Sequence, residues 1–519
     1  DSGAGKIALV LQGNSIFNYT NEIKVGDSVD INGNGVPDHY AVALYTDNQN
    51  LSSGISNTLT AGANGVGIYA QNGSNIKYSG ILNVGDGITG GTGVYTGTTG
   101  TTGSSITLDN AVINLNGTGG IGAYVDNQST LTFEANSTMN FTGDGVGIYG
   151  VQGAIINDHG GIINSNGYAV ERSRVQGGII NILANTSVPA GSILGHAVNG
   201  EVNVLSGVSV TAVGDDVIGI FGDGLKGLGT WTQQYEANNL GTIDFSTSNK
   251  ATGIYLNNAT GENKGILKVN NDSIAFYGQG SGTEIYNSGT IEIGNSSVGL
   301  YGNDADIITN LSGAVIQDTG TVNTGIYNIR TAAGTTAINN NGTVDLGDDG
   351  VGIYAEKGSI TNTGIINVGN KINKNSIGIY AKDSTLNDTG AIKVGDKGIA
   401  FYGDSSILNL NSSNVDISNN GTLAYGVNGA QINYNLGNKT TSENTFIYLI
   451  NSNVDFNGAD ITIANNGLGI YQEGASLVQG YNTLNVGDNA AGIYGFATNV
   501  SNLGNVIVQC KNAVGLIGE

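Results

Sequence analysis

The sequence predicts an all-β fold, a right-handed parallel β-helix of about 20 three-strand coils with loop insertions. Three observations predict it: a tyrosine motif that recurs along the chain, three strand-like pieces in every repeat, and the composition. Of 519 residues, 86 are Gly and 2 are Pro, and 39% are hydrophobic. This composition favours one packed repetitive array over a disordered chain or several globular domains.

The tyrosine motif has the form V-G-I-Y-A. Its clearest copies end at Ala70, Gly150, Gly302, Ala355, Ala381 and Gly495. We take the motif tyrosines and Phe221 as anchors. Degenerate copies supply further anchors at Val10, Val170, Val198, Gly426 and Ile517. The resulting 21 anchors leave 20 intervals over 507 residues, a mean near 25, so the whole chain is one repeat array.

Each repeat contains three pieces of the form G-I-Y, S-x-I-x-N and G-x-I-x-V-G, as in residues 352–370. Each piece alternates apolar and polar residues and is bounded by Gly, Asn, Asp or Ser, which predicts three short strands joined by tight turns. Three such strands cannot close a sheet within one repeat. Stacked coils pair each strand with its equivalents at about 4.8 Å. The signatures of leucine-rich repeats and propeller blades are absent.

Alternation within V-G-I-Y predicts which residues form the core. Its first and third positions, such as Val351 and Ile353, are expected to point inward. Its second and fourth positions, such as Gly352 and Tyr354, are expected to point outward. Stacking would then form an outer ladder of tyrosines beside a column of Gly and Ala.

Charge and cysteine content exclude several classes of function. The net charge of −23 comes with only 18 Lys and Arg, too few to neutralise a nucleic acid backbone. Cys510 is the only cysteine, so no disulfide framework or thiolate metal site is expected. No run of 18 apolar residues and no signal segment after Asp1 occurs. We therefore expect a piece of a longer protein that does not itself insert into a membrane.

The three-piece repeat resembles the passenger region of large Fusobacterium-type autotransporter adhesins of the type V secretion pathway. This resemblance covers essentially all 519 residues. It implies a signal peptide before the segment and an anchoring β-barrel after it, with display at the bacterial cell surface. It also implies binding to host-cell surface glycans, to host receptors or to other bacteria. Paralogues with different ligands share such repeats, so the ligand is not assigned.

Functional residues are expected where the sequence departs from the repeat, because the consensus residues are already explained by their role in the fold. The first departure is the 35-residue interval from Val10 to Tyr45, which contains the pattern D-x-N-x-N-G-x-x-D. That spacing matches a Ca²⁺ loop, although Ala41 stands where a bidentate Glu would be. The candidate Ca²⁺ ligands are Asp30, Asn32, Asn34, Asp38 and the carbonyl of Val36. The alternative is a polar Asx-rich turn.

The second departure is the 34-residue interval from Phe221 to Tyr255, which contains the only tryptophan. Its candidate ligand-binding residues are Trp231, Gln233, Gln234 and Tyr235. Aromatic side chains offer large contact area at low entropic cost, which favours a glycan or protein contact. The alternative is that the loop folds back and buries its tryptophan.

The third departure lies between Tyr149 and Phe221, where GYAV and GHAV replace the motif. In this alignment Tyr168 and His196 fall in the outer Gly column, and the valines that follow fall in the Tyr column. Polar groups gather here, and the candidate ligand-binding residues are Tyr168, Glu171, Arg172, Arg174 and His196. This polar face is either a partner site or sequence drift on an exposed surface.

The fourth departure is a Gly-Asp turn that follows the third strand. It recurs at Asp27, Asp86, Asp144, Asp215, Asp348, Asp396 and Asp488. Stacked carboxylates would repel one another, which a bound cation could relieve. Asx-turns that cap the strands are the simpler explanation.

Binding is the expected function, and catalysis is not. A polysaccharide lyase or hydrolase needs several carboxylates beside a basic residue, but the only arginines are Arg172, Arg174 and Arg330, and no pair of aspartates accompanies them. The insertions place recognition in residues 1–255, and the regular repeats make residues 256–519 stalk-like. An inert stalk that presents a distal adhesin domain is the alternative.

Overall fold

The computed structural model describes residues 5–13, 15–98, 100, 102–151, 153–224, 236–369, 376–412, 414–418, 420–441, 445–498 and 504–519. Within these ranges all regular structure is β-strand. The strands form a right-handed parallel β-solenoid of about 19 turns, which confirms the predicted fold. The chain divides into an N-terminal unit, Asp1–Ile266, and a C-terminal unit, Leu267–Glu519.

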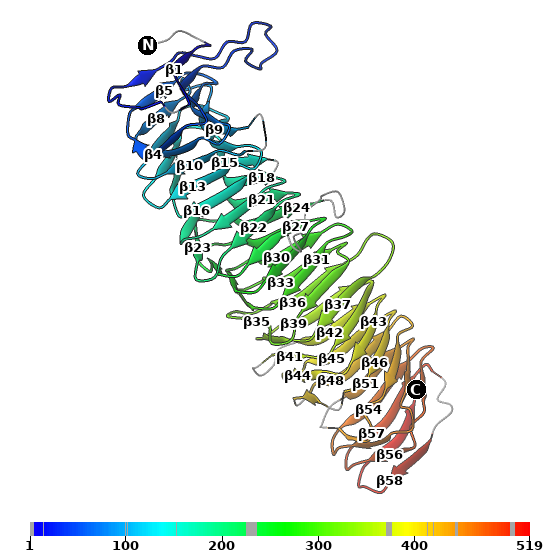
Figure 1. The fold of residues 1–519 in the computed structure, drawn as a ribbon. Helices are drawn as coiled ribbons and strands as arrows, with labels where there is room; N and C mark the ends of the chain where they lie inside the picture. Colours follow the sequence, from blue (N-terminus) through cyan, green and yellow to red (C-terminus); the bar gives the residue numbers. More distant parts are fainter. Residues whose placement is uncertain are drawn as a thin grey trace. The chain divides into compact units, whose positions relative to one another are not determined.

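Successive turns of the N-terminal unit place strands on three faces, and Figure 1 shows these strands stacked as rungs. The first face consists of β1 (Ile7–Gln12), β3 (Val42–Asp47), β6 (Val66–Gln71), β9 (Thr92–Gly97), β12 (Gly120–Val125), β15 (Gly145–Val151), β18 (Val170–Gln176), β21 (Ile193–Val198), β24 (Ile218–Asp223) and β27 (Thr252–Asn257). Each strand pairs in parallel with the next one named.

The second face of the N-terminal unit is also continuous and parallel. It consists of β4 (Asn50–Ile55), β7 (Asn75–Tyr78), β10 (Ser105–Leu108), β13 (Thr130–Glu134), β16 (Ile155–His159), β19 (Ile179–Ile182), β22 (Glu201–Val204), β25 (Ala237–Asn239) and β28 (Thr260–Asn263).

The third face of the N-terminal unit is interrupted. One sheet consists of β2 (Ile23–Lys24), β5 (Leu59–Ala61), β8 (Ile81–Val84), β11 (Val112–Leu115), β14 (Thr138–Phe141) and β17 (Ile162–Asn164). A new sheet begins with β20 (Thr186–Pro189), β23 (Ser209–Val213) and β26 (Thr242–Phe245). The next strand, β29 (Ile266–Val269), contains the boundary between the units. Strands β17 and β20 therefore do not pair with each other.

The C-terminal unit repeats the three-face plan. Its first face consists of β30 (Ile274–Gln279), β33 (Val298–Asn303), β36 (Thr324–Ile329), β39 (Val351–Glu356), β42 (Ile377–Lys382), β45 (Ile399–Asp404), β48 (Thr422–Val427), β51 (Thr445–Ile450), β54 (Leu468–Glu473), β57 (Ala491–Phe496) and β59 (Val514–Gly518). Its second face consists of β31 (Glu284–Asn287), β34 (Ile307–Asn310), β37 (Thr336–Asn340), β40 (Gly358–Asn362), β43 (Thr385–Asp388), β46 (Ile407–Leu410), β49 (Gln431–Tyr434), β52 (Asn453–Asp455) and β55 (Leu477–Gln479).

The third face of the C-terminal unit is interrupted once as well. Its first sheet includes β32 (Thr290–Ile293), β35 (Val315–Asp318), β38 (Thr343–Leu346), β41 (Ile365–Val368), β44 (Ala391–Val394) and β47 (Val415–Ile417). Its second sheet consists of β50 (Lys439–Thr440), β53 (Asp460–Ile463), β56 (Thr483–Val486) and β58 (Asn505–Val508).

The predicted orientation of the first two motif positions is wrong. In β39, Gly352 is buried and points inward, since a Cβ built on it would lie 2.5 Å from the Cγ2 of Ile366 on the third face. Val351 is only half-buried, while Ile353 is fully buried as predicted. Two successive residues therefore face the core, which breaks the strict alternation. Glycine fits the first of them because the side chains of the third face fill the space above it.

The tyrosine ladder lies outward on the first face as predicted. In the C-terminal unit its rings stack from Tyr277 to Tyr494, with neighbouring centroids between 4.3 and 5.5 Å apart. Tyr425 occupies the ladder where the sequence alignment placed Gly426, so that anchor is wrong by one residue. The anchors Val10 and Ile517 are confirmed by their pairing with neighbouring tyrosines.

A second, buried ladder runs at the end of the second-face strands of the C-terminal unit. The Nδ2 of each asparagine donates to the side-chain Oδ1 on the next turn, at 2.7 to 2.9 Å. The ladder contains Asn287, Asn310, Asn340, Asn362 and finally Asp388. These side chains lie within the solenoid, so the asparagine of S-x-I-x-N has an internal hydrogen-bonding role.

Candidate functional site

The strand β18 departs from the repeat, and its sequence is VERSRVQ. Tyr149 pairs with Arg174, Arg174 with His196, and His196 with Phe221. Arg174 and His196 therefore continue the Tyr column. The sequence alignment, which placed His196 in the Gly column and Val170 and Val198 in the Tyr column, is wrong because GYAV and GHAV resemble the motif in a different register.

Tyr168 also lies elsewhere than predicted. It stands in the turn that precedes β18, where its backbone N–H donates to the Ser165 carbonyl at 2.9 Å, and its side chain is exposed. Arg172, by contrast, takes the inward position that Gly147 holds on β15. The structure thus separates the predicted polar face into exposed, outer and internal groups.

Arg172 and Asp158 form an ion pair inside the solenoid. Their side chains are 3% and 0% exposed. The Arg172 Nε and Nη2 donate to the two carboxylate oxygens of Asp158 at 2.6 and 2.8 Å, and Nη2 also donates to the Gly161 carbonyl at 2.6 Å. The guanidinium lies 5.8 Å from the ring centre of Phe133. This bidentate geometry offsets part of the large cost of desolvating two charges.

The core accommodates Arg172 through an exchange of side-chain size. In regular coils the second motif position is small and the third is large, as in Gly147 and Ile148. On β18 this order is reversed, because the third position is Ser173. The order is reversed on β21 as well, where the large Leu194 precedes the small Gly195. Each of the two irregular coils therefore still places one large and one small side chain at these positions.

An outer cluster lies on the opposite side of β18 from the buried pair. The carboxylate of Glu171 contacts His196 Nδ1 at 3.2 Å and Arg174 Nη1 at 3.4 Å. Burial raises the pKa of Glu171, but the hydrogen bond and charge of His196 and the charge of Arg174 outweigh it, so the pKa is lowered overall. His196 stacks on Phe221, with ring centres 4.2 Å apart. Glu171 and Arg174 also line a groove of about 500 Å³.

A second hollow opens on the third face where pairing lapses between β17 and β20. We call it the β17–β20 cleft; its volume is about 620 Å³. Its lining residues are Gly160, Gly161, Ile162, Ile163, Asn164, Ser165, Asn166, Arg172, Asn185, Thr186, Ser187, Pro189, Ser209, Thr211 and Val213. Arg172 is thus part of both the core and the wall of this cleft. Grooves on two faces share the strand β18.

Sequence reasoning missed Asp158, the partner of Arg172. Asp158 lies on β16 in register with Phe133 on one side and Ile182 on the other, so its position is an apolar one in the neighbouring coils. The signal in the sequence was a carboxylate at an inward position of the alternating pattern IINDH. It becomes visible only when neighbouring coils are aligned in the correct register.

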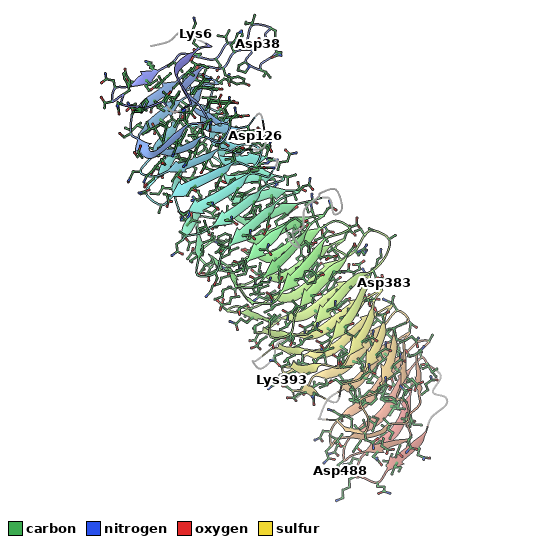
Figure 2. All side chains as sticks on the ribbon, in the orientation of Figure 1. Lys6, Asp38, Asp126, Asp383, Lys393 and Asp488 are labelled. Atoms are coloured by element: carbon green, nitrogen blue, oxygen red, sulfur yellow. The ribbon has the colours of Figure 1, made fainter. Side chains whose placement is uncertain are left out.

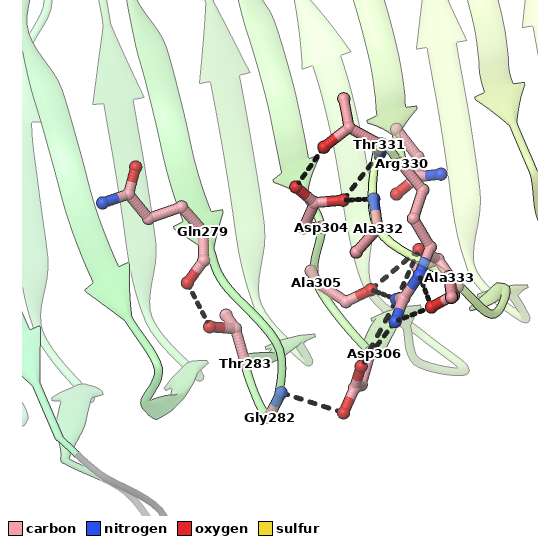
Figure 3. A network of polar contacts seen from close by, with 12 residues as sticks. Gln279, Gly282, Thr283, Asp304, Ala305, Asp306, Arg330, Thr331, Ala332 and Ala333 are labelled. Atoms are coloured by element: carbon pink, nitrogen blue, oxygen red, sulfur yellow. Dashed lines mark hydrogen bonds and ion pairs between the residues drawn. The ribbon is translucent and has the colours of Figure 1, made fainter.

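Arg330 in the C-terminal unit shows a different use of a buried arginine. Its Nε, Nη1 and Nη2 all donate, chiefly to the Ala305 and Ala333 carbonyls and to Asp306, as Figure 3 shows. The neighbouring carboxylate of Asp304 accepts from the backbone N–H groups of Thr331 and Ala332 at 2.7 and 2.8 Å. These bonds fasten the loop after β36 to the preceding turn.

The candidate Ca²⁺ loop is an exposed excursion before β3, and Figure 2 labels Asp38 on it. The Asp30 carboxylate accepts from the backbone N–H of Gly33 and of Gly35, both at 2.7 Å. Asp38 accepts from the backbone N–H groups of Ile31 and Asn32 at 2.6 and 3.2 Å. No group of three or more His, Cys, Asp or Glu that could hold a metal occurs in the described ranges. This loop contributes only two carboxylates, and Ca²⁺ binding stays a prediction.

The Trp231 loop, with Gln233, Gln234 and Tyr235, lies outside the described residues.

Among the Gly-Asp turns, Asp86 accepts from the backbone N–H groups of Ile88 and Thr89 at 2.8 and 2.7 Å. These bonds lower the pKa of Asp86. Capping of this kind accounts for the aspartate at that turn without a cation.

The chain matches no protein-family model, and a search of curated proteins finds no significant relative. Within the described ranges, no helix is long and apolar enough to cross a membrane. The resemblance to autotransporter passengers therefore stands on the repeat and on the solenoid fold, which is compatible with such a passenger.

Proposed function

We propose that the chain is a passenger segment of a surface-displayed autotransporter adhesin. In this proposal it binds host-cell surface glycans or receptors, or other bacteria, and performs no catalysis. The observation that carries it is β18, where charged residues interrupt both the tyrosine column and the apolar core. A buried ion pair is a costly way to stabilise a core, which favours a role other than stability.

The second candidate function is an inert stalk, and the C-terminal unit favours it. There the tyrosine column runs without interruption over ten consecutive strands from β30 to β57. Both roles combine in our proposal: recognition in residues 1–255 and a stalk in residues 256–519. The Trp231 loop is a further proposed contact, and the Asp30 loop a proposed Ca²⁺ site.

The decisive experiment regularises the irregular coils. The residues of β18 are replaced by those of β15 (GVGIYGV), those of β21 by those of β24 (IGIFGD), and Asp158 by Ile. We expect the purified variant to keep its far-UV circular dichroism and to lose binding to epithelial cells or partner bacteria.

The matched control exchanges two regular strands, placing the β42 sequence in β39 and the β39 sequence in β42. This exchange alters two regular coils and leaves the irregular ones intact, and we expect it to bind as the wild type does. If the regularised variant binds as well as the control, recognition does not reside in these coils. If the wild-type chain binds no cell or bacterium, the stalk function stands alone.

A further inference from the structure

The β17–β20 cleft exists because one face of one turn fails to pair. The other two faces of the same turn are continuous, since β15 pairs with β18 and β16 pairs with β19. Only the third strands, β17 and β20, end their sheets here. The opening is thus a local feature of a solenoid that is otherwise closed at this level.

Two residues disfavour pairing between these strands. The Gly161 carbonyl, directly before β17, accepts from Arg172 Nη2. Pro189, within β20, has no backbone N–H to donate to a neighbouring strand. Proline and inward-pointing charged residues are also the devices that protect sheet edges against an added strand. The cleft is therefore ill suited to a peptide strand and suited to a ligand that contacts side chains.

The wall of the cleft holds a buried donor group. Arg172 is 3% exposed and donates through Nε and Nη2 to Asp158 and Gly161, while none of the described residues accepts a hydrogen bond from its Nη1. Its charge is already compensated by Asp158. A neutral acceptor, such as a hydroxyl, matches this group better than a carboxylate does, because a second anion would face a pair with no net charge.

The rest of the lining is uncharged. Apart from Arg172, its polar side chains are amides and hydroxyls, from Asn164, Ser165, Asn166, Asn185, Thr186, Ser187, Ser209 and Thr211. Such groups can donate and accept, as sugar hydroxyls do. Ile162 and Val213 are 50% and 64% exposed and offer apolar surface to the C–H groups of a ring. The volume of about 620 Å³ lies within the usual range for small-ligand sites.

We infer that the β17–β20 cleft binds an uncharged saccharide unit of a glycan, with Arg172 Nη1 donating to a hydroxyl. This inference rests on the proposed adhesin function and names its ligand class and its place. Arg172 both supports the cleft wall and contacts the ligand. The outer cluster around Glu171 lies on a different face and takes no part in this contact.

The test combines a glycan array, containing neutral and acidic oligosaccharides, with a variant that fills the cleft. Ser187 is exposed on β20, and Ser187→Trp places an indole in the opening without changing a buried residue. Ser187 pairs with Thr211, and Thr211 pairs with Asp244 on β26, so Asp244→Trp makes the same change outside the cleft. We expect Ser187→Trp to weaken binding of neutral glycans by about tenfold or more and Asp244→Trp to leave it unchanged.

A second variant, Arg172→Lys, keeps a cation opposite Asp158 but removes the Nη1 donor, and it should weaken neutral-glycan binding with unchanged circular dichroism. If this variant fails to fold, Ser187→Trp decides the question. Equal glycan binding by Ser187→Trp and wild type would overturn the cleft as the site. Binding confined to acidic glycans would overturn the ligand class.

A binding experiment with a peptide distinguishes a saccharide ligand from a peptide that adds a strand to the sheet. The probe is a synthetic peptide with the sequence GTIEIGN, which contains the third-face strand β32. Binding of this peptide that Ser187→Trp abolishes would overturn the inference in favour of strand addition. Cell binding without any glycan binding would overturn the inference while leaving the adhesin proposal intact.

Discussion

Arg172 in the N-terminal unit and Arg330 in the C-terminal unit are both more than nine-tenths buried, but their surroundings differ. Arg330 contacts loop carbonyls and Asp306, whose side chain is 43% exposed. Arg172 lies in the core column against Asp158, which is fully buried. Arg330 fastens a turn, whereas Arg172 lies in the core, pairs with an internal anion and lies beside a face whose strands do not pair.

The largest expected effect comes from removing the internal anion. Asp158→Ala leaves the Arg172 charge buried without a partner and should lower the free energy of unfolding by about 3–5 kcal/mol. Asp306→Ala removes an exposed partner of Arg330 and should cost about 1 kcal/mol or less. Urea denaturation of both variants measures the difference. Equal losses would contradict a core role for the Arg172–Asp158 pair.

A rescue variant sharpens the same comparison. Combining Asp158→Ile, Arg172→Gly and Ser173→Ile restores the small-then-large order of the regular coils and removes both charges. Replacement of a buried ion pair by well-packed apolar groups is often neutral or stabilising. We therefore expect most of the stability lost in Asp158→Ala to return. Continued instability would show that the core at β18 has relaxed around the arginine.

A second comparison concerns two fully buried carboxylates with different partners. Asp158 has an arginine, whereas Asp388 ends the asparagine ladder with Asn362 Nδ2 at 2.7 Å and an unpaired Oδ2. Burial raises the pKa of Asp388 from 3.8 to about 6. The folded state then binds the proton more tightly than the unfolded state, so stability is fully present below pH 3.8 and falls as the pH rises to about 6.

Asp388→Asn removes this titration and extends the ladder with another amide. At pH 7 the variant should be more stable than the wild type by up to about 3 kcal/mol, and the difference should vanish near pH 4. Thermal unfolding at both pH values measures it. An equal stabilisation at pH 4 and pH 7 would mean that proton binding at Asp388 is not the cause.

The regular coils were predictable because the same residue types recur at each stacked position. Tyr354 and Ile353 were placed correctly from the repeat alone. Gly352 was not, because strict alternation ignores that two successive residues can face the core when one has no side chain. Arg172 was recognised as unusual but assigned to an outer face. The burial of Arg172 depends on Asp158 and on the register of β18. That register was predicted wrongly because the sequence GYAV resembles the motif.

Substitution of an inward glycine tests this corrected orientation. Gly352→Ala introduces a methyl group 2.5 Å from the Ile366 side chain and should destabilise the C-terminal unit by about 1–3 kcal/mol. Val351→Thr, at the adjacent half-buried outer position, is the matched control and should cost about 0.5 kcal/mol or less. The unfolding midpoints of the two variants in denaturant measure the difference in stability. A larger loss in the control would restore the original outward assignment of the glycine.

The smallest effect is expected at the Asp30 loop, which precedes the regular coils. A Ca²⁺ titration of this loop tests whether the N-terminal unit also differs from the C-terminal unit by a bound cation. If the loop binds Ca²⁺, free Ca²⁺ at about ten times its Kd should stabilise the folded state by about 1.4 kcal/mol. Asp30→Asn should abolish this increment, because it removes one of only two carboxylates. Asp86→Asn, in a turn where the carboxylate likewise accepts from two backbone N–H groups, should leave it unchanged. A melting temperature that does not respond to Ca²⁺ in the wild type would identify the Asp30 loop as an Asx-rich turn, stabilised by its own N–H donors.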